Sequence, residues 1–131
     1  MLSRTLAGSM TDSARVGAYD DAVLTILARE FSVTDIKETE AKIKRKLRAK
    51  KFGPYDDQRI NRLRLLKDAV KTEITKGHQS KYYSKSAGEF ADMKDFDTPR
   101  LSEHLVTMFP EVPKQSIQEF VEYVIYLHYI R

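Results

Sequence analysis

The stretch that decides the fold is DDQRINRLRLLKDAVKTEIT, residues 56–75. Its apolar residues recur at intervals of three and four, the spacing that places side chains on one face of an α-helix. Asp56 or Asp57 is expected to cap the start of this helix, and Gly77 to end it in a left-handed conformation. The pattern predicts a helix of about 20 residues. Its inner face comprises Ile60, Leu63, Leu66, Val70 and Ile74, broadened by Leu65 and Ala69.

The segments before this helix are also periodic. A second predicted helix covers residues 35–51, and Ser32 or Thr34 is expected to cap it. FGPY, residues 52–55, ends it, because glycine and proline interrupt helices. Its narrow apolar stripe is Ile36, Ile43 and Leu47. Before it, the sequence predicts a first helix with an apolar face of Tyr19, Ala22, Val23, Ile26, Leu27 and Phe31.

The C-terminal part is expected to begin with a loop over residues 77–88 and a short helical turn near 89–96. Thr98 is then expected to cap a helix that has Pro99 in its first position. The inner side of that helix is predicted to be Leu101, Leu105, Met108 and Phe109.

A last helix is predicted to start near Pro113 and to run to the end of the sequence. Within it YVIYLHYI, residues 123–130, is apolar or aromatic on every side. Such a helix is buried all round, so it is either the central helix of the bundle or a strip covered by a partner. No segment has the alternating pattern of a strand. The fold class expected is therefore all-α, a single small bundle of about five helices.

Composition bounds the organisation of the chain. Its 131 residues are typical of one domain, here expected over residues 13–131. Residues 1–12 are expected to be a disordered tail or tag, and an organellar presequence is the alternative. The absence of cysteine excludes disulfides, thiolate metal sites and a cysteine nucleophile, and fits a reducing compartment. We therefore expect a cytoplasmic protein, with organellar import as the alternative.

The charge of +4 is divided unevenly along the chain. Residues 33–85 hold sixteen Lys or Arg and seven acids, whereas residues 86–131 hold four and eight. The basic middle is densest in AKIKRKLRAKK, residues 41–51, in which seven of eleven residues are cationic and none is acidic. Only two of these cations have a glutamate four residues earlier as a local partner. The pattern indicates a surface suited to phosphate groups or to an acidic protein.

No complete catalytic signature is present. The three histidines, His78, His104 and His128, are far apart and lack the spacing of metal ligands. A glycine-rich phosphate loop and a Gly-x-Ser-x-Gly elbow are also missing from the sequence. We therefore expect a protein that is not an enzyme and that has no cofactor, no metal and no membrane partner.

The segment LVTMFPEVPKQSIQEFV, residues 105–121, resembles the front half of a ubiquitin-binding CUE domain. The resemblance covers about 17 residues, through Met108-Phe109-Pro110, Val112 and Ile117. CUE domains have a third helix, whereas here the second helix is predicted to continue to Arg131. The interpretation favoured is a helix-breaking corner with Met108 and Phe109 in the core.

Two hypotheses for function follow. The first is sequence-independent binding of DNA or RNA through the phosphate backbone, with Tyr55, Tyr82 and Tyr83 available to stack on bases. The cations expected to bind are Lys42, Lys44, Arg45, Lys46, Arg48, Lys50, Lys51, Arg59, Arg62 and Arg64. The second is a protein-interaction or assembly subunit, its basic face meeting an acidic protein or the acidic C-terminal part of another copy. Its expected interface residues are Tyr123, Tyr126 and Tyr129.

Overall fold

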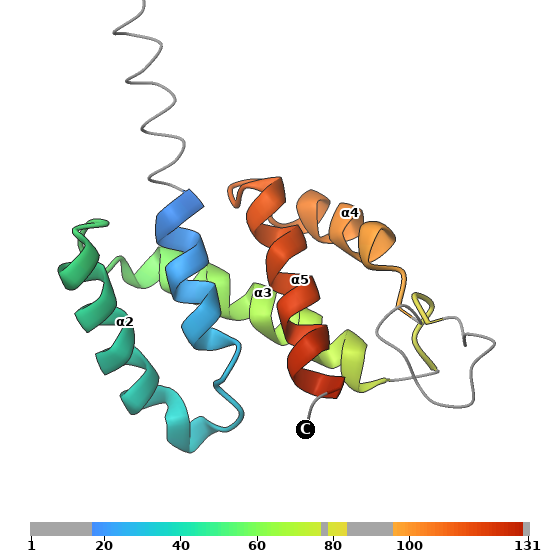
Figure 1. The fold of residues 1–131 in the computed structure, drawn as a ribbon, viewed down its shortest axis with the longest axis horizontal. Coiled ribbons are helices and arrows are strands. Elements are labelled where there is room, and N and C mark those ends of the chain that lie inside the picture. The colour runs from blue at the N-terminus through green and yellow to red at the C-terminus, as the bar shows by residue number, and fades with distance from the viewer. Residues whose placement is uncertain (1–16, 77–78, 84–95, 130–131) are drawn as a thin grey trace, which may run out of the picture.

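The computed structural model describes residues 17–76, 79–83 and 96–129, and this part of the chain is all-α, as predicted (Figure 1). The expected tail at 1–12, the Gly77 cap and the turn near 89–96 lie outside the described residues, apart from Phe96. An N-terminal helix over residues 17–27 precedes the other helical elements. These are η1 (Val33–Asp35), α2 (Ile36–Lys50), α3 (Asp57–Thr75), α4 (Thr98–Met108) and α5 (Lys114–Tyr129).

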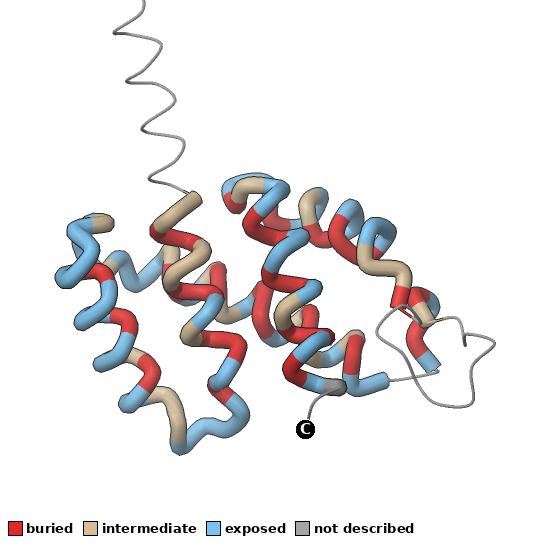
Figure 2. Tube along the Cα trace, in the orientation of Figure 1, coloured by how far each residue is buried: buried red, intermediate tan, exposed pale blue. Residues whose placement is uncertain are grey.

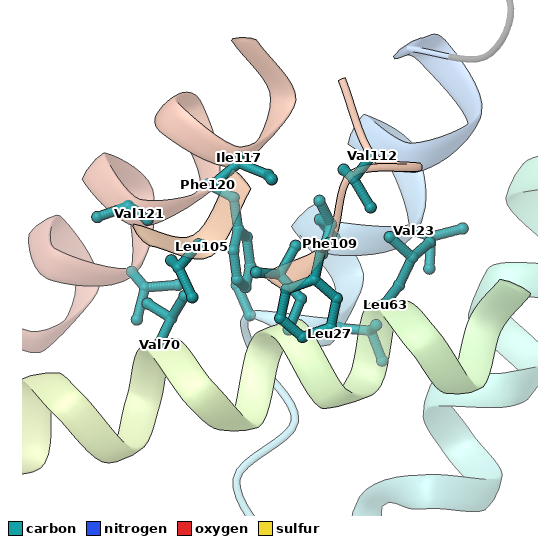
Figure 3. Close-up of a cluster of buried hydrophobic side chains, with 14 of the residues drawn as sticks. Val23, Leu27, Leu63, Val70, Leu105, Phe109, Val112, Ile117, Phe120 and Val121 are labelled. Atoms are coloured by element: carbon teal, nitrogen blue, oxygen red, sulfur yellow. The ribbon is translucent and has the colours of Figure 1, made fainter. Parts of the chain in front are cut away.

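Helix α3 organises the core. The N-terminal helix and α5 both cross it, while α2 lies at one end of the bundle and α4 packs on α5 (Figure 1). Leu63 and Val70 of α3 point into a cluster that receives Val23 from the N-terminal helix and Phe120 from α5 (Figure 3). All five residues of the predicted inner face of α3 are buried, which confirms the periodicity.

Carboxylates cap the starts of α3 and α4, and a third one stabilises the turn before α2. The Asp56 side chain accepts a hydrogen bond from the backbone N–H of Arg59 at 3.2 Å, so Asp56 is the cap of α3. Asp97 does the same for Arg100 at 3.2 Å, and the prediction of Thr98 as the cap of α4 is wrong by one residue. The Asp35 carboxylate accepts from the backbone N–H of Ser32 at 3.1 Å, where η1 leads into α2.

Some apolar residues predicted to be inside are exposed. Phe31 is 54% exposed because the N-terminal helix ends at residue 27, so Phe31 lies beyond the helix and is not part of its inner face. Leu65 is 52% exposed, on the outer edge of α3. Met108 is 46% exposed, since Leu105 and Phe109 occupy the inner positions at the corner after α4. The expected corner thus has Phe109 in the core and Met108 outside it.

Helix α5 is not buried on every side within this chain, so the alternative that made it the central helix of the bundle is wrong, while its coverage by a partner stays a prediction. It contacts α3 and α4, and these contacts bury Ile117, Val121 and Ile125. Tyr126, on the other side of the helix, is 47% exposed. The apolar residues of α5 therefore fill the core on one side, and Tyr126 lies on the surface among polar residues.

A tyrosine joins the N-terminal helix to the turn between α2 and α3. The Tyr19 hydroxyl donates a hydrogen bond to the carbonyl oxygen of Pro54 at 3.0 Å and accepts one from the backbone N–H of Asp56 at 3.1 Å. Its ring is 1% exposed. This arrangement fixes the position of the turn relative to the core.

Candidate nucleic-acid interface

Helix α2 buries a narrow stripe and exposes the rest of its surface. Ile43 and Leu47 are fully buried and Thr39 nearly so, one residue per turn facing the bundle. Figure 2 shows most of the α2 trace as exposed. The expected stripe is thus confirmed at Ile43 and Leu47, whereas Ile36 is only half-buried at the start of the helix. A helix held this way presents its other faces to solvent.

From Lys42 to the C-cap, the exposed faces of α2 carry seven cations, here called the α2 basic face: Lys42, Lys44, Arg45, Lys46, Arg48, Lys50 and Lys51. Lys42 pairs with Glu38 at 3.1 Å, as expected, and both side chains are more than half exposed. Lys44 Nζ lies 5.0 Å from the centroid of the Tyr55 ring. Within the described residues, the other five side chains make no ion pair or hydrogen bond.

The arginines of α3 do not extend this face. Arg59 Nε donates to the buried Asp20 carboxylate at 2.9 Å, and its guanidinium lies 3.8 Å from the centroid of the Tyr19 ring. Burial raises the pKa of Asp20, while the hydrogen bond from Arg59 opposes that shift. Arg59 thereby ties α3 to the N-terminal helix.

Arg62 makes a second link, at the surface, where its side chain is 43% exposed and that of Glu111 is 47% exposed. Its Nε donates to Glu111 at 2.8 Å, and a terminal nitrogen donates to the carbonyl oxygen of Met108 at 3.0 Å. The guanidinium also lies 4.6 Å from the centroid of the Phe109 ring. Arg62 thus stabilises the corner between α4 and α5.

Arg64 belongs to a buried cluster around Glu30. It donates to both oxygens of the Glu30 carboxylate, at 2.9 and 3.0 Å, and Lys67 Nζ donates to one of them at 2.8 Å. Lys71 Nζ donates to the Glu30 carbonyl oxygen at 2.7 Å, and Lys67 also pairs with Asp68 at 2.8 Å. Burial alone would raise the pKa of Glu30, but the hydrogen bonds from Arg64 and Lys67 outweigh it and lower the pKa to about 2. Glu30 is 3% exposed.

Sequence reasoning missed these three links. The acids lie 34 to 49 residues from their arginines, so no local spacing relates them. In the sequence, the spacing of Arg59, Arg62 and Arg64 does not distinguish them from cations that face solvent. A lone acid at the end of a helix, such as Glu30, gives no signal that it is buried. Of the ten cations expected to bind, the seven of the α2 basic face lie on one helix and its C-cap and are exposed. The three of α3 are each paired with an acid, Arg64 in a buried cluster and Arg62 at the surface.

The tyrosines expected to stack on bases or to form an interface also differ in their exposure. Tyr55 lies beside the α2 basic face, whereas Tyr82 is 4% exposed and Tyr83 packs edge-on against Phe96, with ring centroids 5.6 Å apart. On α5, Tyr123 is half-buried and Tyr126 is exposed. The side chain of Tyr129 lies outside the described residues.

Within the described ranges, no group of three or more His, Asp or Glu side chains is arranged to hold a metal ion. The same part of the chain contains no helix of the length and apolar content that crossing a membrane requires. Comparisons of the chain with protein-family models, curated proteins and solved structures found no match.

Proposed function

We propose that the α2 basic face binds the phosphate backbone of nucleic acid, largely independently of base sequence. The observation that carries the proposal is the five cations of this face, Arg45, Lys46, Arg48, Lys50 and Lys51, that have no partner among the described residues. Cations already paired with acids are less available to phosphates, because the acid must be displaced first. Unpaired arginines and lysines bind phosphates and release counterions from the nucleic acid.

The internal links of α3 also support the proposal. In these links the arginines of α3 neutralise Asp20, Glu30 and Glu111. The unpaired positive charge is therefore concentrated on α2. A single exposed helix with cations on several sides lies along a backbone or in a groove without requiring specific base contacts. Binding of this kind is strongly dependent on salt.

Neutralising three of these cations tests the proposal. The variant Arg45/Lys46/Arg48→Gln retains the helix propensity of α2. It removes no side-chain hydrogen bond or ion pair among the described residues. We expect weaker binding to a labelled duplex. We also expect the slope of log affinity against log salt to be shallower by about 2 to 3, since each phosphate contact contributes about 0.9. Fluorescence anisotropy at four or more salt concentrations measures both quantities.

The matched control is Arg29/Lys81/Lys114→Gln, which removes the same charge from exposed positions outside α2. If both variants weaken binding equally, the net charge and not the α2 basic face determines affinity, and the proposal is wrong. A wild-type protein that does not bind duplex or single strand even at low salt would also refute it. Circular dichroism confirms that each variant is folded.

A second candidate is assembly through α5. The exposure of the large aromatic side chain of Tyr126 on the outer side of α5 favours it, because such side chains are enriched in protein interfaces. In such an assembly the α2 basic face would contact either the acidic C-terminal part of another copy or an acidic partner protein.

For this candidate we expect Tyr126→Glu to abolish any concentration-dependent self-association, because a charge would be buried in the interface. Sedimentation velocity over a hundredfold concentration range gives the measurement. Gln118→Glu, an exposed position on the same helix, is expected to leave the association unchanged. A wild-type protein that stays monomeric at the highest concentration excludes self-association through α5.

A further inference from the structure

An open hollow of about 550 Å³ lies where α2 ends and the chain turns towards α3. Its lining contains the cations Lys44, Arg48 and Lys51, and none of its residues is acidic. Lys44 and Arg48 are four residues apart on one edge of α2, so their side chains start about 6 Å apart along the helix axis. The hollow is therefore a cationic site with an aromatic wall, which is provided by Tyr55.

The Tyr55 ring turns a face towards Lys44. Lys44 Nζ lies 5.0 Å from the ring centroid, within the range of a cation–π contact. Tyr55 is half-buried and packs against the core. A flat, apolar surface is thus placed directly beside groups that bind phosphate.

The turn that carries Tyr55 is held rigidly. The backbone N–H of Phe52 donates to the Leu47 carbonyl oxygen at 3.0 Å, and Lys51 adopts a left-handed conformation with φ of 56°. The Tyr19 hydroxyl bonds both sides of Tyr55 in the chain, at Pro54 and Asp56. A binding group fixed in place before the ligand arrives loses little conformational entropy on binding.

We infer that this hollow binds one unpaired base of a single-stranded nucleic acid, stacked on Tyr55, with the adjacent phosphates on Lys44, Arg48 and Lys51. The inference rests on the proposed function and names its substrate class. An unpaired base has a free π-face for an aromatic side chain, whereas the bases of a duplex are already stacked on one another. The Lys44 ammonium moves from the ring to a phosphate when the base enters.

The test compares a labelled single strand of 12 nucleotides with the same strand lacking its bases. Both carry the same phosphates, so the difference in affinity isolates the contribution of the bases. We expect wild-type protein to bind the normal strand about 5- to 150-fold more tightly. Tyr55→Phe is expected to retain this ratio, and Tyr55→Leu, which removes the aromatic face but keeps an apolar side chain, to reduce it to near one.

Two controls separate this inference from the proposed function. Tyr126→Leu removes an exposed tyrosine elsewhere and is expected to keep the wild-type ratio. Duplex binding is expected to be equal in wild type and Tyr55→Leu, which also shows that the variant is folded. If wild type binds both strands equally, or if Tyr55→Leu keeps the ratio, the inference is wrong while salt-dependent binding still supports the proposed function. If wild type binds no nucleic acid at low salt, both are overturned.

Discussion

Replacing Glu30 with glutamine is expected to lower the free energy of unfolding by about 3–5 kcal/mol, because it leaves the largely buried Arg64 without its counter-ion and Lys67 with Asp68 alone. Glu30 is 3% exposed and accepts three charge-assisted hydrogen bonds, two from Arg64 and one from Lys67. Glutamine keeps the shape and one acceptor oxygen but removes the negative charge. Denaturant unfolding followed by circular dichroism measures the difference.

The matched control is Glu38→Gln, which removes one partner of the exposed pair with Lys42. Both side chains there are more than half exposed, so the expected change is within about 0.5 kcal/mol. Equal effects of the two substitutions would mean that the Glu30 cluster contributes no more than a surface ion pair.

The same glutamate is expected to contribute to acid sensitivity. Its pKa in the folded state is about 2, against an ordinary value of 4.5. Because the folded-state pKa is lowered, ionised Glu30 stabilises the fold above pH 4.5, and the stabilisation is lost as pH falls from 4.5 towards 2. The shift corresponds to roughly 3 kcal/mol. The stability of wild type and Glu30→Gln is therefore expected to converge over this interval, and parallel curves would contradict it.

Truncating Leu66 to alanine is expected to destabilise the fold by about 2–5 kcal/mol, the range for a buried leucine that leaves a cavity. Leu66 is fully buried on α3, the helix crossed by the N-terminal helix and α5 (Figure 1). Leu66 belongs to the buried cluster that forms the core. The measurement is again the free energy of unfolding in denaturant. We expect the denaturant midpoint to fall while the slope of the unfolding free energy against denaturant concentration stays unchanged.

The neighbouring Leu65 provides the control, because it is 52% exposed on the same helix. Leu65→Ala is expected to change the stability by no more than about 0.5 kcal/mol, since it removes a partly solvated side chain and alanine favours a helix. If both leucines contribute equally, the assignment of inner and outer faces on α3 is wrong.

Much of the fold was predictable from local patterns. The face of α3 follows from its spacing of three and four, and the end of α2 follows from the glycine and proline of the 52–55 turn. Errors occur where the pattern runs past an element, as at Phe31, or where a corner decides which of two adjacent residues faces inward, as at Met108 and Phe109. Periodicity gives no information on where the chain leaves the helix.

The candidate site was also predictable only in part from the sequence. The sequence by itself determined that α2 is a helix with a narrow apolar stripe, and therefore that its dense cations face solvent, because a helix with one buried residue per turn exposes the rest. Only the tertiary structure decided which cations are free. Arg59, Arg62 and Arg64 are matched with acids 34 to 49 residues away, and Tyr55 is placed beside Lys44 by a turn that Tyr19 holds from another helix. The physical reason is that an ion pair or a stacked ring depends on distances in space, and local spacing encodes such distances only within one helix.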